Sequence, residues 1–140
     1  MDIFQIDDDG RLVISPAIQD WAPLRASGID VVIDLEGAVD TGIPVRSNDC
    51  LYIYFPIDDD NEGDPPLVRL RAIARMSASL MGSGHRVLAH CGMGFNRSAL
   101  VAGLILVELG MPGAEAVARL RERRPGALFN DRFADVLGAL

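Results

Sequence analysis

The chain has 140 residues, 49% hydrophobic and 24% charged, so it is long enough and apolar enough to bury a core as one folded domain. Its net charge of −7 argues against nonspecific binding to nucleic acid or to an anionic membrane surface. The longest apolar run, residues 99–107, is shorter than the roughly 20 residues that span a membrane, and the acidic N-terminus lacks a signal-peptide pattern. We therefore expect a cytoplasmic protein that binds neither membrane nor nucleic acid.

The first third of the chain predicts a hairpin, a helix and a strand, in that order. Hydrophobic and polar residues alternate in segments 3–6 and 11–15, and Gly10 between them suits the positive φ of a tight turn. Residues 20–29 carry apolar side chains at helical spacing and lead into the run 31–35, which reads as a strand.

The rest of the chain continues this alternation. A branched and aromatic run at 51–57 ends in an acidic loop, DDDNEGD at residues 58–64, and Asp64, which precedes two prolines, suits the N-cap of a helix. Strands alternating with helices predict an α/β domain with a short, largely parallel central sheet flanked by helices. The later expected elements are a helix that ends at the glycines 82 and 84, a strand at 86–90, a buried helix from 97 to 109, and helices at 114–123 and 131–137.

The segment HCGMGFNRS, residues 90–98, lies between the strand at 86–90 and the buried helix. Gly92 and Gly94 permit the backbone angles that let successive N–H groups converge on one point. The helix directs its own unpaired N–H groups and the positive end of its dipole to the same place, and the Arg97 guanidinium suits two oxygens of a phosphate. This arrangement predicts an anion cradle.

Cys91 begins this loop, where positively polarised surroundings favour a thiolate. A thiolate beneath a bound phosphate is a nucleophile. His90 can tune it by hydrogen bonding, and the Ser98 hydroxyl can stabilise the sulfur when it becomes a leaving group. Release of an alcohol also needs a proton donor, and three aspartates at 58–60 follow the strand at 51–57, at the same edge of a parallel sheet.

The complete pattern H-C-x-x-G-x-x-R-S, formed by His90, Cys91, Gly94, Arg97 and Ser98, resembles the signature of the cysteine-based protein tyrosine phosphatase superfamily, specifically its small dual-specificity group. The likeness extends over most of the chain and includes the segments GIDVVIDL, FPIDD and RRPGALFNDRF. It implies one catalytic domain, residues 1–140, that hydrolyses phosphomonoesters with no metal and no other cofactor.

The resemblance also implies a role for each motif residue. Cys91 would attack phosphorus and form a phosphocysteine, Arg97 and the backbone amides of residues 92–97 would hold the phosphate, and Asp59 in FPIDD would be the general acid and base. Whether Asp58 or Asp60 could replace Asp59 stays open.

Two further residues have alternative readings. Asn130 matches the position that orients the hydrolytic water in the family, and a helix N-cap is at least as suitable a role for it. Cys50 lies before a strand and matches no redox position, so we expect a packed, inert thiol.

The loop interior indicates the class of substrate. It consists of Gly92, Met93, Gly94, Phe95 and Asn96, which add no positive charge to that of Arg97. Relatives that act on phosphoinositides tend to carry lysines there, and the acidic loop repels polyanions. We expect a phosphorylated protein or peptide as substrate, with phosphotyrosine first and phosphoserine or phosphothreonine next; a phosphoinositide, a nucleotide or an RNA 5′-phosphate is the alternative.

Two other classes of protein also use an anion loop. Sulfurtransferases and arsenate reductases carry a cysteine in such a loop, but the five-residue spacing to Arg97 and the available acid favour a phosphatase. A phosphate-binding module without catalysis typically lacks the cysteine, the arginine or the acid, and this chain keeps all three.

Overall fold

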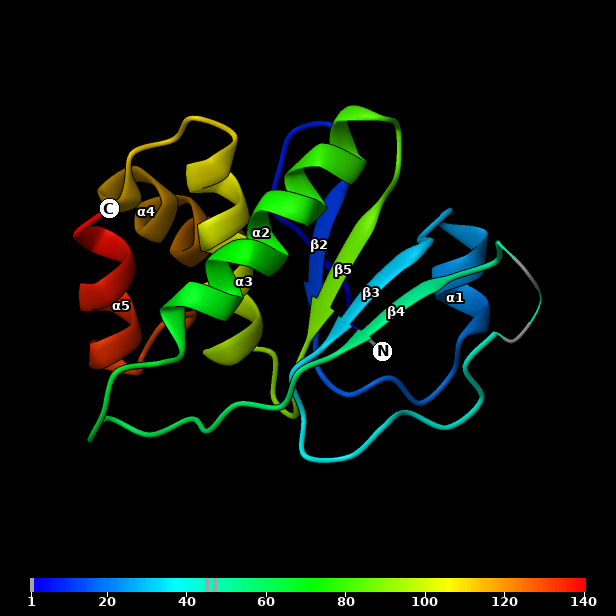
Figure 1. Ribbon diagram of the computed structural model, residues 1–140, viewed down its shortest axis with the longest axis horizontal. Coiled ribbons are helices and arrows are strands. Elements are labelled where there is room, and N and C mark those ends of the chain that lie inside the picture. Colours follow the sequence, from blue (N-terminus) through cyan, green and yellow to red (C-terminus); the bar gives the residue numbers. More distant parts are fainter. Residues whose placement is uncertain (1, 45, 47) are drawn as a thin grey trace.

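A five-stranded sheet forms the centre of the computed structural model, which describes residues 2–44, 46 and 48–140 (Figure 1). The strand order is β1-β2-β5-β3-β4. Strand β1 pairs with β2 in antiparallel fashion, and β2, β5, β3 and β4 run parallel, which confirms the predicted α/β class with its largely parallel sheet. The strands are β1 (Phe4–Gln5), β2 (Leu12–Ser15), β3 (Val31–Asp34), β4 (Leu51–Tyr54) and β5 (Val87–His90).

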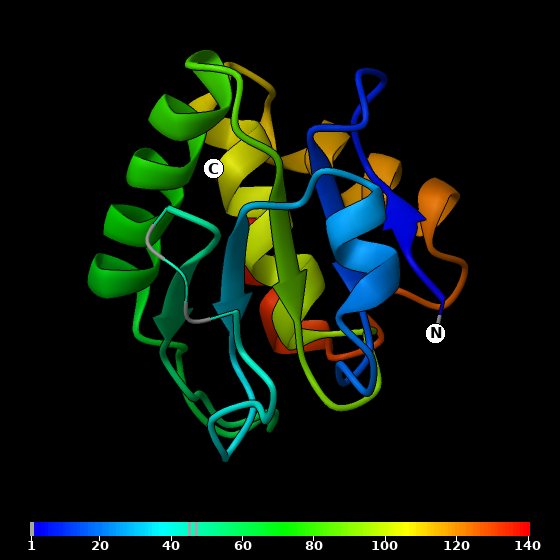
Figure 2. The ribbon, with the colours of Figure 1, turned by 90° about the vertical axis from the view of Figure 1, so that its right-hand side faces the viewer.

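The helices divide unequally between the two faces of this sheet. Figure 2 shows α1 in front of the sheet and the other helices behind it. Because successive side chains of a strand point to opposite faces, the same strands supply two cores: Val13, Val32 and Leu88 pack with Leu24 of α1, whereas their neighbours along the strands pack against the larger helical layer. The helices are α1 (Ala22–Ala26), α2 (Leu67–Gly82), α3 (Arg97–Glu108), α4 (Gly113–Arg123) and α5 (Asp131–Gly138).

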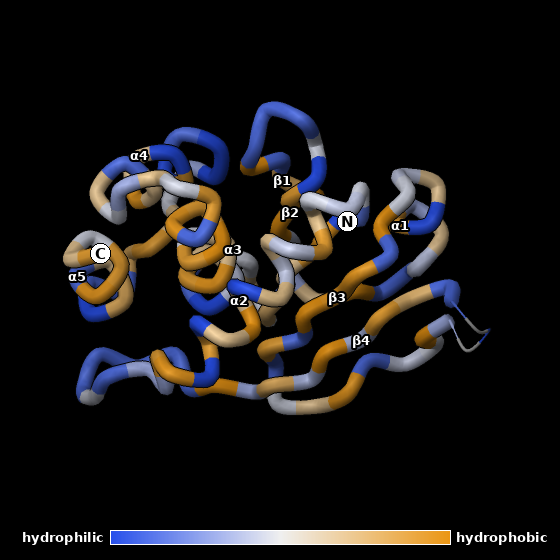
Figure 3. The backbone as a smooth tube through the Cα atoms, turned by 45° about the horizontal axis from the view of Figure 1, so that its top comes forward, coloured by the Kyte–Doolittle hydropathy of each residue, from blue (hydrophilic) through white to orange (hydrophobic). Residues whose placement is uncertain are grey.

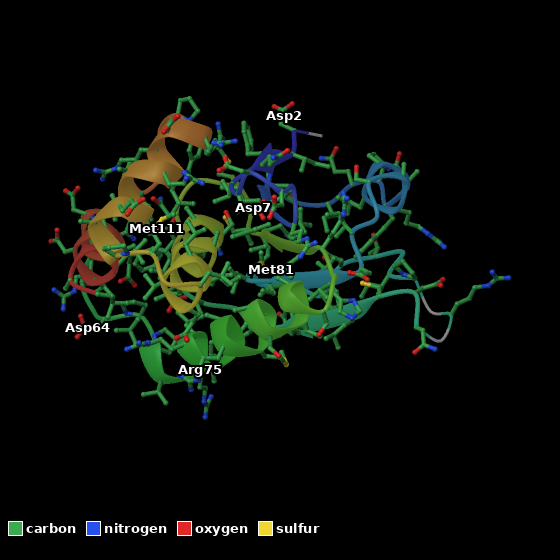
Figure 4. All side chains as sticks on the ribbon, turned by 90° about the horizontal axis from the view of Figure 1, so that it is seen from above. Asp2, Asp7, Asp64, Arg75, Met81 and Met111 are labelled. Carbon is green, nitrogen blue, oxygen red and sulfur yellow. The ribbon has the colours of Figure 1, made fainter. Side chains whose placement is uncertain are left out.

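Helix α3 lies at the centre of the helical layer. All residues from Ser98 to Leu106 are buried, which confirms the prediction of a helix that is apolar nearly all round, and the tube in Figure 3 is mostly orange along it. Gly110, with φ +104°, follows its end. Helix α2 is amphipathic instead: Arg75 points away from the molecule and Met81 points inward (Figure 4). None of the helices in the described part of the chain is long and apolar enough to cross a bilayer.

One predicted helix start is wrong. Helix α2 begins at Leu67 with Pro66 at its N-cap position and no side-chain cap, so Asp64 is not the cap residue. The Asp64 carboxylate accepts a hydrogen bond from Arg132 of α5 instead, and Figure 4 shows it at the periphery beside that helix. A partner 68 residues away in sequence therefore replaces the local backbone N–H groups that the pattern suggested.

The parallel strands bring the motif residues to one edge of the sheet. Strand β5 ends at His90, directly before Cys91, and it lies between β2 and β3. The chain that leaves β4 runs along the same edge, where Ile57 N donates to Leu35 O at 3.3 Å. The cysteine loop and the acidic loop consequently meet at the carboxyl ends of the strands.

Candidate active site

The cysteine loop, residues 91–96, wraps the Cys91 sulfur. Cys91 is only 2% exposed, its Sγ accepts a hydrogen bond from Gly94 N at 3.3 Å, and it lies 3.4 Å from Ser98 Oγ. Ser98 is in the first turn of α3, so the helix N-terminus is directed toward the sulfur. A backbone N–H, a hydroxyl and the N-terminus of a helix thus surround the sulfur atom of Cys91.

Two glycines let the loop fit between β2 and β3. Gly94 has φ +73°, and a Cβ on it would lie 2.9 Å from Pro16 N. A Cβ on Gly92 would lie 2.8 Å from Glu36 Oε1. A larger residue would therefore strain the backbone at Gly94 and displace the Glu36 carboxylate at Gly92.

Arg97 fills the space between the cysteine loop and the acidic loop. Its Nη1 donates to Leu35 O and Ile57 O, each at 3.4 Å, and its Nη2 lies 3.9 Å from Glu36 Oε1. Its side chain is 17% exposed, and its Nε is buried without a hydrogen-bond partner among the described residues. An N–H donor left unpaired in this way suits an anion that enters the loop.

Asp59 is held by two side-chain amides, one from the cysteine loop and one from the N-cap of α5. Its Oδ2 accepts from Asn96 Nδ2 at 3.0 Å, and its Oδ1 accepts from Asn130 Nδ2 at 2.8 Å. The two amides are themselves joined, because Asn130 N donates to Asn96 Oδ1 at 2.9 Å. The Asp60 carboxylate accepts only from Glu62 N within its own loop, at 3.2 Å, and among the described residues no hydrogen bond reaches the side chain of Asp58. Of the three aspartates, Asp59 is therefore the one whose carboxylate is bound by the amides of Asn96 and Asn130.

Asn130 is the N-cap of α5, one of the two roles that the sequence left open, and it also holds the Asp59 carboxylate. Its Oδ1 accepts from Phe133 N at 3.2 Å, which caps α5, while its Nδ2 binds Asp59 and Asp60 O. The water-orienting role stays a prediction. The role of Asn96 in holding Asp59 was not predicted, because its position just before Arg97 gives no signal for this contact. Its side chain turns to the acidic loop rather than into the cradle.

The other predicted loop side chains also point away from the cradle. Met93 is 69% exposed, and Phe95 packs edge to face on Phe129, with ring centroids 5.7 Å apart. Glycines 92 and 94 have no side chain, so the inner side of the loop presents backbone N–H groups, such as Gly94 N, rather than side chains.

His90 belongs to a buried network that sequence analysis did not find. Its Nε2 lies 2.7 Å from Asp40 Oδ2 and 3.5 Å from Asp34 Oδ1, and Tyr52 OH donates to Asp34 and accepts from Asp40 N. Burial raises the pKa of Asp40, and His90 lowers it in part. Burial and the Asp34 carboxylate raise the pKa of Tyr52. Asp34, Asp40 and His90 have the donor atoms of a metal site, but these hydrogen bonds already engage them.

A cavity of about 930 Å³ opens beside Arg97 and Asp59. It is lined by residues of the segment 56–66, together with Gly37, Arg97 and Phe133 of α5. A nucleophile beneath an anion cradle and an acid at the rim of a cavity are together suited to displacement at a bound oxyanion ester.

The chain matches the family model described as "Dual specificity phosphatase, catalytic domain" over residues 12–139. Among solved structures, it is similar to Tk-PTP in the active form, with 26% sequence identity and a TM-score of 0.75 over 99% of this chain and 95% of that chain. Human DUSP28 (20% identity, TM-score 0.80, 98% of this chain and 90% of that chain) and the Yvh1 phosphatase domain from Chaetomium thermophilum (21%, 0.79, 99% and 94%) share the fold. No match is found among curated proteins.

Proposed function

Because the chain belongs to the dual specificity phosphatase family and is a cysteine-dependent protein phosphatase, we propose that residues 1–140 form one catalytic domain that hydrolyses phosphoproteins through a phosphocysteine on Cys91. The observation that carries the proposal is the buried Cys91 sulfur, 3.3 Å from Gly94 N at the floor of the loop. A thiol that meets an inward N–H and a helix N-terminus, with the Arg97 guanidinium at the same edge of the sheet, suits an anionic ester.

The first step transfers the phosphoryl group to sulfur. The Cys91 thiolate attacks phosphorus while the P–O bond to the leaving alcohol breaks, and Asp59 gives its proton to that oxygen. Arg97 and the loop amides bind the three remaining phosphoryl oxygens. Asn96 of the cysteine loop, at 3.0 Å, and Asn130 at the N-cap of α5, at 2.8 Å, support this step by donating to the two oxygens of the Asp59 carboxylate.

The second step releases inorganic phosphate. Asp59, now a carboxylate, takes a proton from water as the water attacks the phosphocysteine, and the S–P bond breaks. Ser98 Oγ, 3.4 Å from the sulfur, stabilises the thiolate that departs. No step requires a metal, and the reduced thiol that the cycle needs fits a reducing compartment such as the cytoplasm.

The charge around the site supports phosphorylated proteins rather than polyanionic substrates. The cavity beside Arg97 is lined by five acidic residues, Asp58, Asp59, Asp60, Glu62 and Asp64. Phosphoinositides and nucleotides carry additional negative charges, which this rim repels. A phosphate on a tyrosine, serine or threonine side chain presents one dianion and leaves the rim free for the peptide.

The test is hydrolysis of an aryl phosphate by the purified chain in the presence of a chelator. We expect turnover that vanadate blocks and that Cys91→Ser abolishes. A side-by-side comparison of phosphopeptides, phosphoinositides and nucleotides then gives the substrate class. Activity that appears only with an added divalent metal contradicts the mechanism, and persulfide formation from thiosulfate without phosphate release contradicts the reaction.

A further inference from the structure

We propose that Arg124, which the sequence motif does not include, is a positioning residue that fixes the cysteine loop in its anion-binding shape. The inference rests on the proposed function of that loop, and it adds a residue from a different part of the chain. Arg124 lies at the C-cap position of α4, 30 residues beyond the loop it contacts.

The contacts of Arg124 are with the outer carbonyls of the loop. Its Nε donates to Gly94 O at 3.2 Å and its Nη2 donates to Met93 O at 3.4 Å. One guanidinium therefore bridges two consecutive peptide groups through two different nitrogens in a fixed plane, whereas an ammonium group has to reach both carbonyls from one nitrogen on a flexible stem.

Peptide geometry carries this outer contact to the sulfur. In a trans peptide the C=O and the next N–H point in opposite directions, so holding Met93 O outward directs Gly94 N inward. Gly94 N is the group that donates to Cys91 Sγ at 3.3 Å. In the same way, holding Gly94 O outward directs the N–H of Phe95 to the inner side. Arg124 thus sets the direction of two donors of the cradle.

The guanidinium is itself held rigidly. It lies 3.8 Å from the centroid of the Phe95 ring and 4.3 Å from that of Phe4 in β1, so that the two rings enclose it. Phe95 is fixed in turn, because its carbonyl accepts from Leu128 N at 2.9 Å. A partly buried cation between aromatic rings loses little freedom when it bonds the loop.

The positive charge of Arg124 also favours anion binding by the loop. Hydrogen bonds from a cation to the outer carbonyls polarise the two peptide groups and make their inward N–H groups more positive. Arg97, the first residue of α3, is the one basic side chain of the segment HCGMGFNRS apart from His90. Arg124 therefore adds a second guanidinium, on the outer side of the loop. We therefore expect its loss to weaken anion binding as well as turnover.

The experiment compares Arg124→Ala and Arg124→Lys with the control Arg123→Ala. Arg123 is the neighbouring arginine at the end of α4, and it pairs with Asp8 at 2.6 Å rather than with the loop. Each variant is assayed for kcat and KM on an aryl phosphate. Alkylation of Cys91 by anionic iodoacetate and neutral iodoacetamide, with and without inorganic phosphate, reports on the cradle without requiring turnover.

We expect Arg124→Ala to lower kcat/KM about ten- to hundredfold, the range for one charge-assisted hydrogen bond. The preference of Cys91 for iodoacetate over iodoacetamide falls, and the phosphate concentration that protects it rises about tenfold by the same estimate. Arg123→Ala stays within about twofold of the unmodified chain, as surface substitutions usually do. Arg124→Lys keeps the positive charge but not the planar pair of donors, so its kcat/KM and phosphate protection should lie closer to those of Arg124→Ala than to those of the unmodified chain.

Three results would overturn the inference. The first is unchanged phosphate protection in Arg124→Ala at an unchanged melting temperature, and the second is an equal loss in Arg123→Ala. The third is complete restoration by Arg124→Lys, which would make charge alone sufficient. If the unmodified chain hydrolyses no phosphoester, the proposed function fails, but the alkylation measurements still decide the role of Arg124.

Discussion

Asn130 connects the stability of α5 to the position of Asp59, and two substitutions separate these roles. Asn130→Ala removes both the cap to Phe133 N and the Nδ2 donor to Asp59. Asn130→Ser keeps a hydroxyl that caps the helix, but that hydroxyl is too short to reach the Asp59 carboxylate, which now lies 2.8 Å from Nδ2.

The magnitudes follow from these contacts. Loss of an N-cap costs about 1 kcal/mol, which lowers the melting temperature of a chain of this size by roughly 3 to 6 °C. A hydrogen bond to a charged group contributes about 1.5–3 kcal/mol, so a misplaced Asp59 lowers kcat about ten- to hundredfold. We expect both losses in Asn130→Ala and the kinetic loss alone in Asn130→Ser.

The assays are thermal unfolding and steady-state hydrolysis of an aryl phosphate, repeated in an Asp59→Asn background. Because Asn130 acts through Asp59, Asn130→Ser should cost little once the acid is gone, so the two effects should be non-additive. Unchanged kcat in Asn130→Ser, or full additivity with Asp59→Asn, would refute the reasoning that the amide positions the acid.

Three other predictions concern single residues. Asp59→Asn should lower kcat roughly 10²- to 10⁴-fold, whereas Asp58→Asn, whose carboxylate is bound by neither Asn96 nor Asn130, should retain most of the activity; equal losses in steady-state kinetics would contradict the choice of acid. Gly94→Ala should lower the melting temperature and abolish phosphate binding, because the added Cβ lies 2.9 Å from the neighbouring backbone at φ +73°; calorimetry with inorganic phosphate measures both, and wild-type binding would be inconsistent with the loop geometry. Burial and nearby aspartates raise the pKa of the Cys50 thiol, so a smaller fraction of it is thiolate at pH 8 than in an ordinary cysteine. Mass spectrometry after brief iodoacetamide treatment at pH 8 should find Cys91 labelled first, and preferential labelling of Cys50 would oppose this.

Local patterns in the sequence were sufficient to predict the order of helices and strands and to single out the cysteine loop. Apolar periodicity and the positions of glycines predicted the hairpin at Gly10, with φ +71°, and the ends of the helices. The same reasoning was wrong at Asp64, because a carboxylate near a helix start can bind a distant arginine as readily as a local N–H. Patterns of this kind report on neighbours in sequence.

The contacts that complete the site join residues distant in sequence. Asp59 is held by Asn96 and Asn130, which are 37 and 71 residues away, and His90 is held by Asp40, 50 residues away. Asparagine, tyrosine and arginine are common surface residues, so nothing local marks Asn96 or Arg124 as partners of the loop. The family resemblance and the helix start did single out Asn130, but only as a residue that orients water or as a helix cap, and not as a partner of Asp59.

The sequence by itself determined the α/β fold and the chemistry of the cysteine loop, since the strand and helix periods, the glycines and the spacing from Cys91 to Arg97 are all local. Only the tertiary structure decided which aspartate is anchored beside the loop and which arginine holds its carbonyls. Both depend on the parallel pairing of β5 with β2 and β3 and on the packing of α4 and α5, which bring side chains from separate segments within 3.5 Å of one another. Such contacts are set by packing, and no short-range pattern in the sequence encodes them.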